Sequence, residues 1–250
     1  MKIIYEPRGR ALEYAALAAN LSRGCAHRCA YCFAPGALRM KRDEFHDRPV
    51  PRAGVLKALE RDAARMAGDQ RTVLLSFTSD PYQPCEVDDG LTRRAIKVLK
   101  RHGLHVEILT KGGTRACRDF DLLDHDDRFA TTLTCDNDHD SLAWEPGAAL
   151  PANRVEAIKD AKSMGLTTWV SCEPVLYPEQ TLRLIEMTAP FVDLFKVGTL
   201  NYHPRAKEID WPAFALDVVS LLRRLGCYYY LKADLKEYLP GTVLEEESDG

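Results

Sequence analysis

Three cysteines near the N-terminus are spaced to hold a metal centre: Cys25, Cys29 and Cys32 are separated by three and by two residues. Thiolates this close on one loop, which Gly24 and Ala26 keep free of bulk, can wrap three iron corners of a [4Fe–4S] cube. The fourth iron would then lack a protein ligand. A structural zinc site normally closes its fourth position, and a ferredoxin normally supplies a fourth cysteine. The spacing favours a cluster with one open iron, with zinc binding or simple burial as the alternatives.

The chain carries eight cysteines in 250 residues and begins without the apolar core of a secretory signal. No apolar run approaches the roughly 20 residues that cross a bilayer. We therefore expect a soluble cytoplasmic protein without a membrane partner, whose reduced thiols serve metal binding, catalysis or packing. The net charge of −3 is spread along the chain and neither favours nor excludes nucleic acid.

Apolar and β-branched runs alternate with helical stretches, which is the pattern of repeated βα units around a parallel sheet. The predicted strands are 15–21, 72–77, 105–110, 129–133, 167–171 and 192–197, with 228–232 as a candidate seventh. The predicted helices are 52–66, 92–101, 152–164, 178–188 and 212–225, and 118–123 is at best a short helix. This pattern predicts a single α/β domain over 1–238, followed by an acidic, disordered tail over 239–250.

Reactive residue types follow the predicted strands at their carboxyl ends, where α/β barrels place their active sites. Polar residues also collect in loops of every kind, but here each strand is followed by such a group. In strand order, these groups are the cysteine triplet, Ser79 and Asp80, Lys111, Thr134 and Cys135, Cys172 and Glu173, Asn201, and Lys232 and Asp234.

The cysteine loop, with the aromatic Tyr31 just before its last cysteine, resembles the radical S-adenosylmethionine superfamily. Within it, the chain is similar to the group related to spore photoproduct lyase. The segments that carry the resemblance are 20–35, 76–84, 109–111, 169–174, 197–202 and 230–232. The resemblance implies a partial (β/α)6 TIM-type barrel whose open iron binds S-adenosylmethionine. A flavodoxin- or ferredoxin-like donor would supply one electron, and cleavage would give a 5′-deoxyadenosyl radical that abstracts hydrogen from the substrate.

The same resemblance assigns cofactor contacts to several residues. Tyr31 would lie by the adenine or merely pack the loop, and Asp80, with Ser79, would meet the methionyl amine or form a turn before a proline. Asn201 lies in a loop that resembles the adenine side of the family's site. Thr132 and Thr134 are two residues apart and would lie on the same face of their strand, so one of them would place its hydroxyl at the ribose. Strands favour threonine in any case.

Glu173 has two interpretations. It would bind cofactor hydroxyls or substrate, or it would be a buried ionic partner of Lys111 or Lys196. Lys232 and Asp234 would similarly face the substrate or pair with each other.

Catalytic residues are not defined by the sequence; the candidates are Cys135, Cys172, Glu173 and Lys111. Spore photoproduct lyase is expected to return hydrogen to its product from a thiol, which directs attention to the two cysteines. A free cysteine taken by itself is more often a small buried apolar residue. A second cluster formed by Cys85 and Cys117 with these two is a further hypothesis that their spacing does not require.

Basic residues follow the cysteine loop and also occupy one predicted helix, where they would contact phosphates or simply be solvated. They are Arg39, Lys41 and Arg42, and Arg93, Arg94, Lys97, Lys100 and Arg101. The substrate is accordingly a nucleic-acid base or lesion, a peptide or a small metabolite. The competing class is a non-catalytic iron–sulfur protein for electron transfer or sensing.

Overall fold

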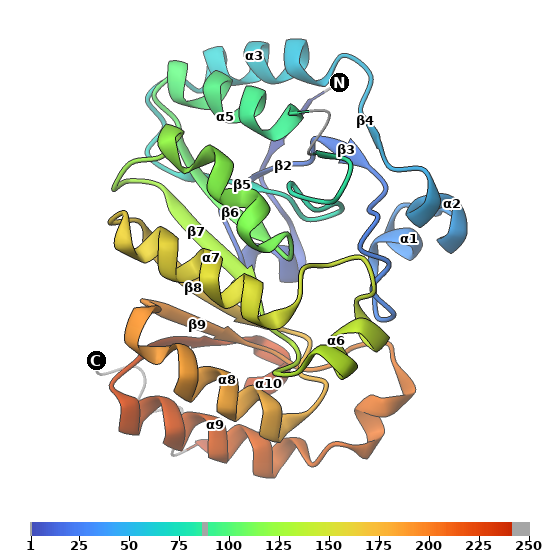
Figure 1. Ribbon diagram of the computed structural model, residues 1–250, viewed down its shortest axis with the longest axis vertical. Helices are drawn as coiled ribbons and strands as arrows, with labels where there is room; N and C mark the ends of the chain where they lie inside the picture. The colour runs from blue at the N-terminus through green and yellow to red at the C-terminus, as the bar shows by residue number, and fades with distance from the viewer. Residues whose placement is uncertain (1, 87–89, 242–250) are drawn as a thin grey trace.

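The computed structural model describes residues 2–86 and 90–241. In this part of the chain, one sheet has the strand order β1-β2-β5-β6-β7-β8-β9-β10. Neighbours from β2 to β10 are parallel, while β1 runs antiparallel to β2. Helices pack along the outer side of the curved sheet (Figure 1). The predicted partial barrel is thus confirmed, and β10 is its seventh parallel strand.

The main sheet consists of short strands joined by crossover helices. Its strands are β1 (Ile4–Tyr5), β2 (Leu17–Ala19), β5 (Thr72–Leu75), β6 (His105–Thr110), β7 (Arg128–Thr132), β8 (Thr167–Cys172), β9 (Leu194–Val197) and β10 (Tyr228–Leu231). A separate two-stranded hairpin pairs β3 (Ser22–Arg23) with β4 (Val50–Pro51). The strand β2 is shorter than the strand predicted at 15–21, because its pairing with β5 is limited to two residues.

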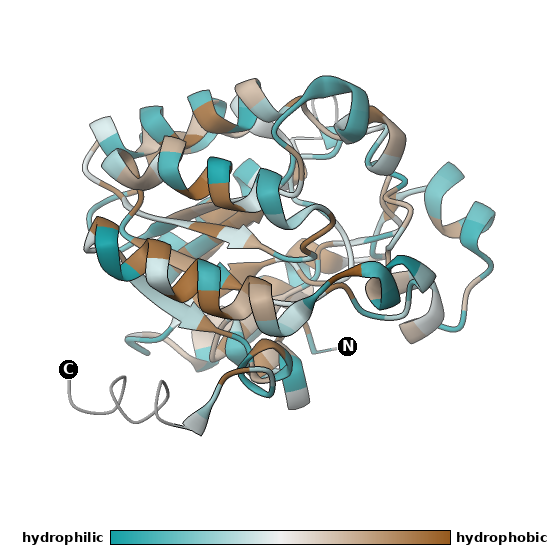
Figure 2. Ribbon diagram, turned by 90° about the horizontal axis from the view of Figure 1, so that it is seen from below, coloured by the Kyte–Doolittle hydropathy of each residue, from teal (hydrophilic) through white to brown (hydrophobic). Residues whose placement is uncertain are grey.

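Hydrophilic and hydrophobic residues alternate along several of the helices that cover the sheet, as Figure 2 shows. One amphipathic example is α5, which buries Leu91, Ala95 and Ile96 and exposes Arg94 and Lys97. The α-helices are α1 (Ala34–Ala37), α2 (Arg42–Asp47), α3 (Val55–Arg65), α5 (Leu91–Arg101), α6 (Asp138–Trp144), α7 (Pro151–Ser163), α8 (Pro178–Thr188), α9 (Trp211–Leu225) and α10 (Ala233–Lys236). The 3-10 segments are η1 (Gly9–Glu13), η2 (Gly113–Leu122), η3 (Ala189–Phe191) and η4 (Pro204–Glu208). The short helix predicted at 118–123 is therefore the second half of η2.

The two faces of the sheet have different cores. The outer face contributes to a large apolar cluster that extends from Ile3 to Leu239. The inner face carries a small cluster in which the buried Trp169 packs with small side chains such as Ala18 and Ala130. Because alternate residues of a strand point to opposite faces, one bulky indole among alanines fills the narrow interior.

The chain end beyond α10 packs for at least part of its length. Leu239, which the sequence places in the tail, is only 7% exposed and joins the large apolar cluster. Packing thus continues past the predicted boundary at residue 238. Residues 242–250 of the predicted tail lie outside the described part of the chain.

Candidate active site

A cavity of about 400 Å³ opens at the carboxyl ends of the strands and brings together most of the predicted site residues. Its wall contains the three cysteines of the N-terminal loop and seven of the other ten candidates. These seven are Tyr31, Ser79, Asp80, Lys111, Thr132, Glu173 and Asn201. The remaining three candidates, Thr134, Cys135 and Cys172, do not line this cavity.

The cysteine loop is held by backbone contacts with α2. The amide of Cys25 donates to the carbonyl of Phe45 at 3.1 Å, and His46 Nδ1 lies 2.8 Å from the carbonyl oxygen of Cys25. Gly24 adopts φ +90°, and a Cβ there would lie 2.6 Å from the Phe45 carbonyl. Glycine is therefore required before the first cysteine both for its conformation and for the close approach.

Arg42 closes the loop from outside. Its guanidinium donates to the carbonyl of Cys29, to that of Ala30 at 2.8 Å and to that of Cys32 at 3.3 Å. The sequence made Arg42 a candidate phosphate contact. These bonds engage the side chain with the cysteine loop instead, because three carbonyls of that loop converge on the guanidinium.

The three cysteine sulfurs suit a cluster better than a single ion. Three side chains can share one metal ion when their ligand atoms all lie within 4.8 Å of one another. Among the described residues, the exposed Asp124, His125 and Asp126 form the one group that meets this condition, so the three cysteine sulfurs lie further apart. Sulfurs that bind one tetrahedral zinc ion at about 2.3 Å would be about 3.8 Å apart. Burial raises the pKa of the Cys29 thiol to about 12, so metal binding here must release protons. The donor set therefore fits a [4Fe–4S] cluster.

A second connection secures the loop from the segment after α6. The amide of Ala30 donates to the carbonyl of Trp144 at 2.7 Å, and the amide of Gly147 donates to that of His27 at 3.0 Å. A Cβ at Gly147 would collide with the carbonyl of Ala26. Local sequence carries no signal for this contact, which joins residues more than a hundred positions apart.

We expect Gly147→Ala to displace the cysteine loop and lower both the thermal midpoint and the iron bound after anaerobic reconstitution. Backbone overlap of this kind costs about 1–3 kcal/mol, as overpacking does elsewhere. Gly36→Ala in α1 is the matched control, because its Cβ would meet no atom within 4 Å. Equal iron content and equal midpoints in the two variants would contradict the assigned contact.

Behind the loop, four polar side chains form a buried network. Tyr31 donates its hydroxyl to Glu145, which pairs with Arg154 at 2.5 Å and lies 3.9 Å from Lys111 Nζ. Arg154 is 1% exposed and also donates to the carbonyl of Thr132 at 3.0 Å. Burial alone would raise the pKa of Glu145, but Arg154 and Lys111 hold it below its usual value. Glu145 and Arg154 were not predicted from the sequence.

Asp80 joins three loops. Its carboxylate accepts from Thr110 Oγ1 at 2.6 Å and from the amides of Tyr82 and Lys111 at 2.8 Å, and it lies 3.4 Å from His27 Nδ1. Burial opposes ionisation, but His27 and these hydrogen bonds hold the pKa of Asp80 well below its usual range. Both of its oxygens are engaged within the chain, which agrees with the turn-forming interpretation of this residue.

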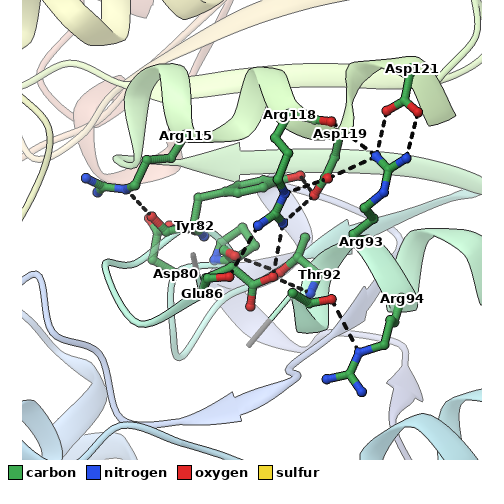
Figure 3. Close-up of polar contacts among 12 residues, drawn as sticks. Asp80, Tyr82, Glu86, Thr92, Arg93, Arg94, Arg115, Arg118, Asp119 and Asp121 are labelled. Carbon is green, nitrogen blue, oxygen red and sulfur yellow. Dashed lines mark hydrogen bonds and ion pairs between the residues drawn. The ribbon is translucent and has the colours of Figure 1, made fainter. Parts of the chain in front are cut away.

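The loop after Asp80 is anchored by a chain of polar contacts shown in Figure 3. Tyr82 donates its hydroxyl to the fully buried Asp119 at 3.1 Å, and Asp119 is in turn bound by Arg118 at 2.8 Å and by Arg93 at 3.2 Å. Arg93 also pairs with Asp121 at 2.6 Å.

This pairing extends along α5, whose basic residues were candidate phosphate contacts. Lys100 pairs with Asp124 and Asp127, and Arg101 pairs with Glu60. Three of the five basic residues of this helix, Arg93, Lys100 and Arg101, are therefore paired within the chain.

The opposite end of the cavity is built around Glu173. Its carboxylate lies 2.9 Å from Lys232 Nζ, accepts from the Tyr14 hydroxyl and lies 3.9 Å from Arg10. Lys232 is 1% exposed and sits 3.1 Å from the centre of the Tyr14 ring. Arg10 and Tyr14, which precede β2, were not recognised in the sequence, where nothing near them marks a site.

Several predicted pairings are therefore wrong. Glu173 pairs with Lys232 and Arg10 rather than with Lys111 or Lys196, because Lys196 points to the carbonyl of Tyr14 at 2.7 Å. Lys232 and Asp234 do not pair with each other.

Asp234 has different partners. It accepts hydrogen bonds from Arg10, Thr199 and Asn201, the last at 2.9 Å. These bonds tie the loop after β9 to the start of α10.

The three candidates outside the cavity wall are buried for different reasons. Thr134 is 1% exposed. Because β7 ends at Thr132, the regular placement of alternate side chains on the two faces of the sheet does not extend to Thr134. Cys135 and Cys172 are 2% and 1% exposed and belong to the large apolar cluster, which matches the packing interpretation of these thiols.

The hypothesis of a second cluster has no support in the structure. Cys117 Sγ lies 3.7 Å from Asp160 Oδ2, while Cys135 and Cys172 are packed in the core.

Residues 19–192 match the model of the Radical SAM superfamily, where SAM stands for S-adenosylmethionine. Because this match covers more than half of the chain, the protein belongs to the radical SAM superfamily. Enzymes of this superfamily use a [4Fe–4S] cluster and S-adenosylmethionine. No helix in the described part of the chain is long and apolar enough to span a membrane.

The chain is similar to two proteins that are themselves uncharacterized. One, from Mycobacterium tuberculosis, is 30% identical over 172 residues, which are 63% of this chain and 48% of that protein. The other, from Methanocaldococcus jannaschii, is 26% identical over 182 residues, 71% of this chain and 68% of that protein. The chain thus spans about half the length of the mycobacterial relative.

Two solved structures share the fold. Spore photoproduct lyase complexed with dinucleoside spore photoproduct superposes with a TM-score of 0.67 at 15% identity, covering 90% of this chain and 79% of that one. Streptococcus suis SuiB bound to S-adenosylmethionine gives a TM-score of 0.65 at 14% identity, covering 92% of this chain and 54% of that one.

Proposed function

We propose that Cys25, Cys29 and Cys32 hold the [4Fe–4S] cluster, and that S-adenosylmethionine occupies the cavity between this loop and the strand ends. When bound, the two groups supply a 5′-deoxyadenosyl radical that removes a hydrogen atom from the substrate. The single observation that carries this proposal is the shared cavity, in which the three cysteines face residues from successive strand ends. The chain's own contribution is to position the cofactor and to exclude water.

Different residues of the cavity wall would contact different parts of S-adenosylmethionine. Tyr31 would contact the adenine and Asn201 would bind on the same side, while Thr132 would reach the ribose and Ser79 the methionyl amine. Lys111 is a half-buried ammonium on the cavity wall. Burial alone would lower its pKa, but the thiolate form of Cys29 and the carboxylate of Glu145 raise it. A cation held there suits the methionyl carboxylate.

We expect Lys111→Met to raise the KM for S-adenosylmethionine roughly 10- to 100-fold, since a hydrogen bond to a charged group contributes about 1.5–3 kcal/mol. Lys111→Arg should recover part of this loss. Lys97→Met, on the exposed side of α5, is the control. A KM unchanged by Lys111→Met would remove this residue from the cofactor site. The measurement is the rate of 5′-deoxyadenosine formation at varied S-adenosylmethionine concentration.

For the substrate we infer a planar ring, with a nucleic-acid base or base lesion as the first candidate. Two exposed aromatic side chains line the cavity, Phe33 at 56% and Tyr202 at 94% exposure, and aromatic faces of this kind stack on bases. The lyase of similar fold was solved with a dinucleoside photoproduct. Among the described residues, the cluster ligands are the only thiols that line the cavity, so a hydrogen returned by cysteine is not part of this proposal.

The test is transfer of deuterium from labelled substrates into 5′-deoxyadenosine. Oligonucleotides deuterated in their bases should transfer label, whereas peptides deuterated at their α-carbons should not. Transfer of deuterium from peptides alone would indicate that the substrate is a peptide and not a nucleobase. A cluster that is reduced but never yields 5′-deoxyadenosine would instead indicate an electron-transfer or sensing protein.

The enzyme needs a one-electron reductant. We propose a flavodoxin- or ferredoxin-like protein in this role, because Cys29 is only 7% exposed and a docked protein would bring its redox group close to a cluster held there.

A further inference from the structure

Positive charge is concentrated in the segment that wraps the cysteines. Residues 20–52 contain seven arginine or lysine residues and three acidic ones, a net charge of +4, whereas the whole chain has a net charge of −3. The rest of the chain therefore carries a net charge of −7. A local field of opposite sign to the whole protein is a basis for steering a charged partner to one face.

Three of these cations are both exposed and without a side-chain partner in the described part of the chain. Arg39, Lys41 and Arg48 are exposed, and their side chains make no hydrogen bond or ion pair within the described residues. By contrast, Arg28 pairs with Asp47, and Arg42 is engaged with the carbonyls of the loop. We call Arg39, Lys41 and Arg48 the basic face.

The basic face lies beside the cysteines. Its residues flank α1 and α2, which project together at one side of the sheet in Figure 1. Residues of α2 contact the loop directly, since the Phe45 carbonyl accepts from the Cys25 amide at 3.1 Å. A partner seated on α1 and α2 would therefore approach the cluster from outside while leaving the cavity to the substrate.

We propose that the basic face is the docking surface for an acidic one-electron donor protein, an inference that rests on the proposed function. The donor gives up one electron and is oxidised, the cluster takes up that electron and is reduced, and no bond or proton passes between the two proteins. Complementary charge would mainly accelerate their encounter, by about 10-fold or more at low salt.

A nucleic acid fits this surface less well. A phosphate backbone that crosses the cavity mouth would need cations on both sides. On the side opposite the cysteines, Arg10 is bound to Asp234 and Lys232 is bound to Glu173, so these two cations are neutralised within the chain. A compact acidic protein needs one basic face, which is what the chain provides.

The test compares wild type, the triple variant Arg39→Glu/Lys41→Glu/Arg48→Glu, and a control with the same change in charge. The control is Lys57→Glu/Arg65→Glu/Lys97→Glu, whose three exposed residues lie on α3 and α5. Two readouts are used: the Kd for an oxidised flavodoxin of low isoelectric point, and the rate of 5′-deoxyadenosine formation with that flavodoxin in its reduced form or with dithionite.

We expect the triple variant, but not the control, to weaken flavodoxin binding and slow flavodoxin-driven turnover by about 10-fold or more, with the wild-type rate falling as salt increases. Dithionite-driven turnover should be equal in all three proteins. Equal flavodoxin binding by the triple variant and the control would overturn the docking surface. The docking surface would also be overturned if the triple variant lost binding to a fluorescent single-stranded oligonucleotide while its binding of flavodoxin stayed intact.

A wild-type protein that makes no 5′-deoxyadenosine with dithionite would overturn the proposed function instead. Binding of the oxidised flavodoxin would then still decide the docking surface, because that measurement does not depend on turnover.

Discussion

Cys29→Ala is expected to abolish formation of 5′-deoxyadenosine and to leave the reconstituted protein without the visible absorbance of a [4Fe–4S] cluster. Cys29 is 7% exposed, and its carbonyl is held by Arg42, so no other thiol of the loop can move into its place. Loss of a direct ligand should exceed the roughly 10- to 100-fold effect typical of an outer-shell partner of a metal site. The rate is measured anaerobically with dithionite as the reductant.

Cys135→Ala is the matched control for this experiment. Cys135 is 2% exposed but packs in the apolar core rather than on the cavity wall, so iron content and turnover should stay near the wild-type values. Turnover that survives in Cys29→Ala would refute the assigned ligand set. Turnover lost in Cys135→Ala with the cluster intact would restore this thiol as a catalytic candidate.

Glu145→Gln is expected to destabilise the protein by about 3–5 kcal/mol, because removing one member of a buried ion pair leaves the other charge uncompensated. Arg154 is 1% exposed and pairs with Glu145 at 2.5 Å, and the glutamine would keep nearly the same shape while losing the charge. The free energy of unfolding is obtained from urea denaturation.

Two comparisons separate the charge effect from a general loss of packing. The double variant Glu145→Gln/Arg154→Met should recover part of the stability, because it also removes the unpaired charge. Glu186→Gln breaks an exposed pair with Arg224, whose two side chains are 50% and 67% exposed, and should cost less than about 1 kcal/mol. If Glu145→Gln were no worse than Glu186→Gln, the network would contribute little to stability.

Local patterns were sufficient to predict the alternation of parallel strands and helices, whereas the partial barrel was predicted from the family resemblance. Strands such as 105–110 are short apolar runs set between helical stretches, and parallel neighbours in a sheet are usually joined by a helical crossover. The elements that were missed are short and irregular, as β1, the β3–β4 hairpin and α1 show. Segments of two to four residues carry too few apolar positions for their period to be recognised.

The sequence by itself determined the cysteine loop, because three thiols within eight residues must lie together in any fold. It also placed Lys111 and Glu173 at strand ends, since parallel strands present their carboxyl ends on one side of the sheet.

Only the tertiary structure decided which of these side chains meet. Glu173 faces Lys232 and Tyr14, and Glu145 reaches Tyr31 across more than a hundred residues. It also decided that Cys135 and Cys172 point into the core rather than the cavity. Such outcomes depend on where each strand ends and on how separate loops cross. Spacing along the chain does not contain that information, because a change of one residue in a strand turns its side chain to the opposite face.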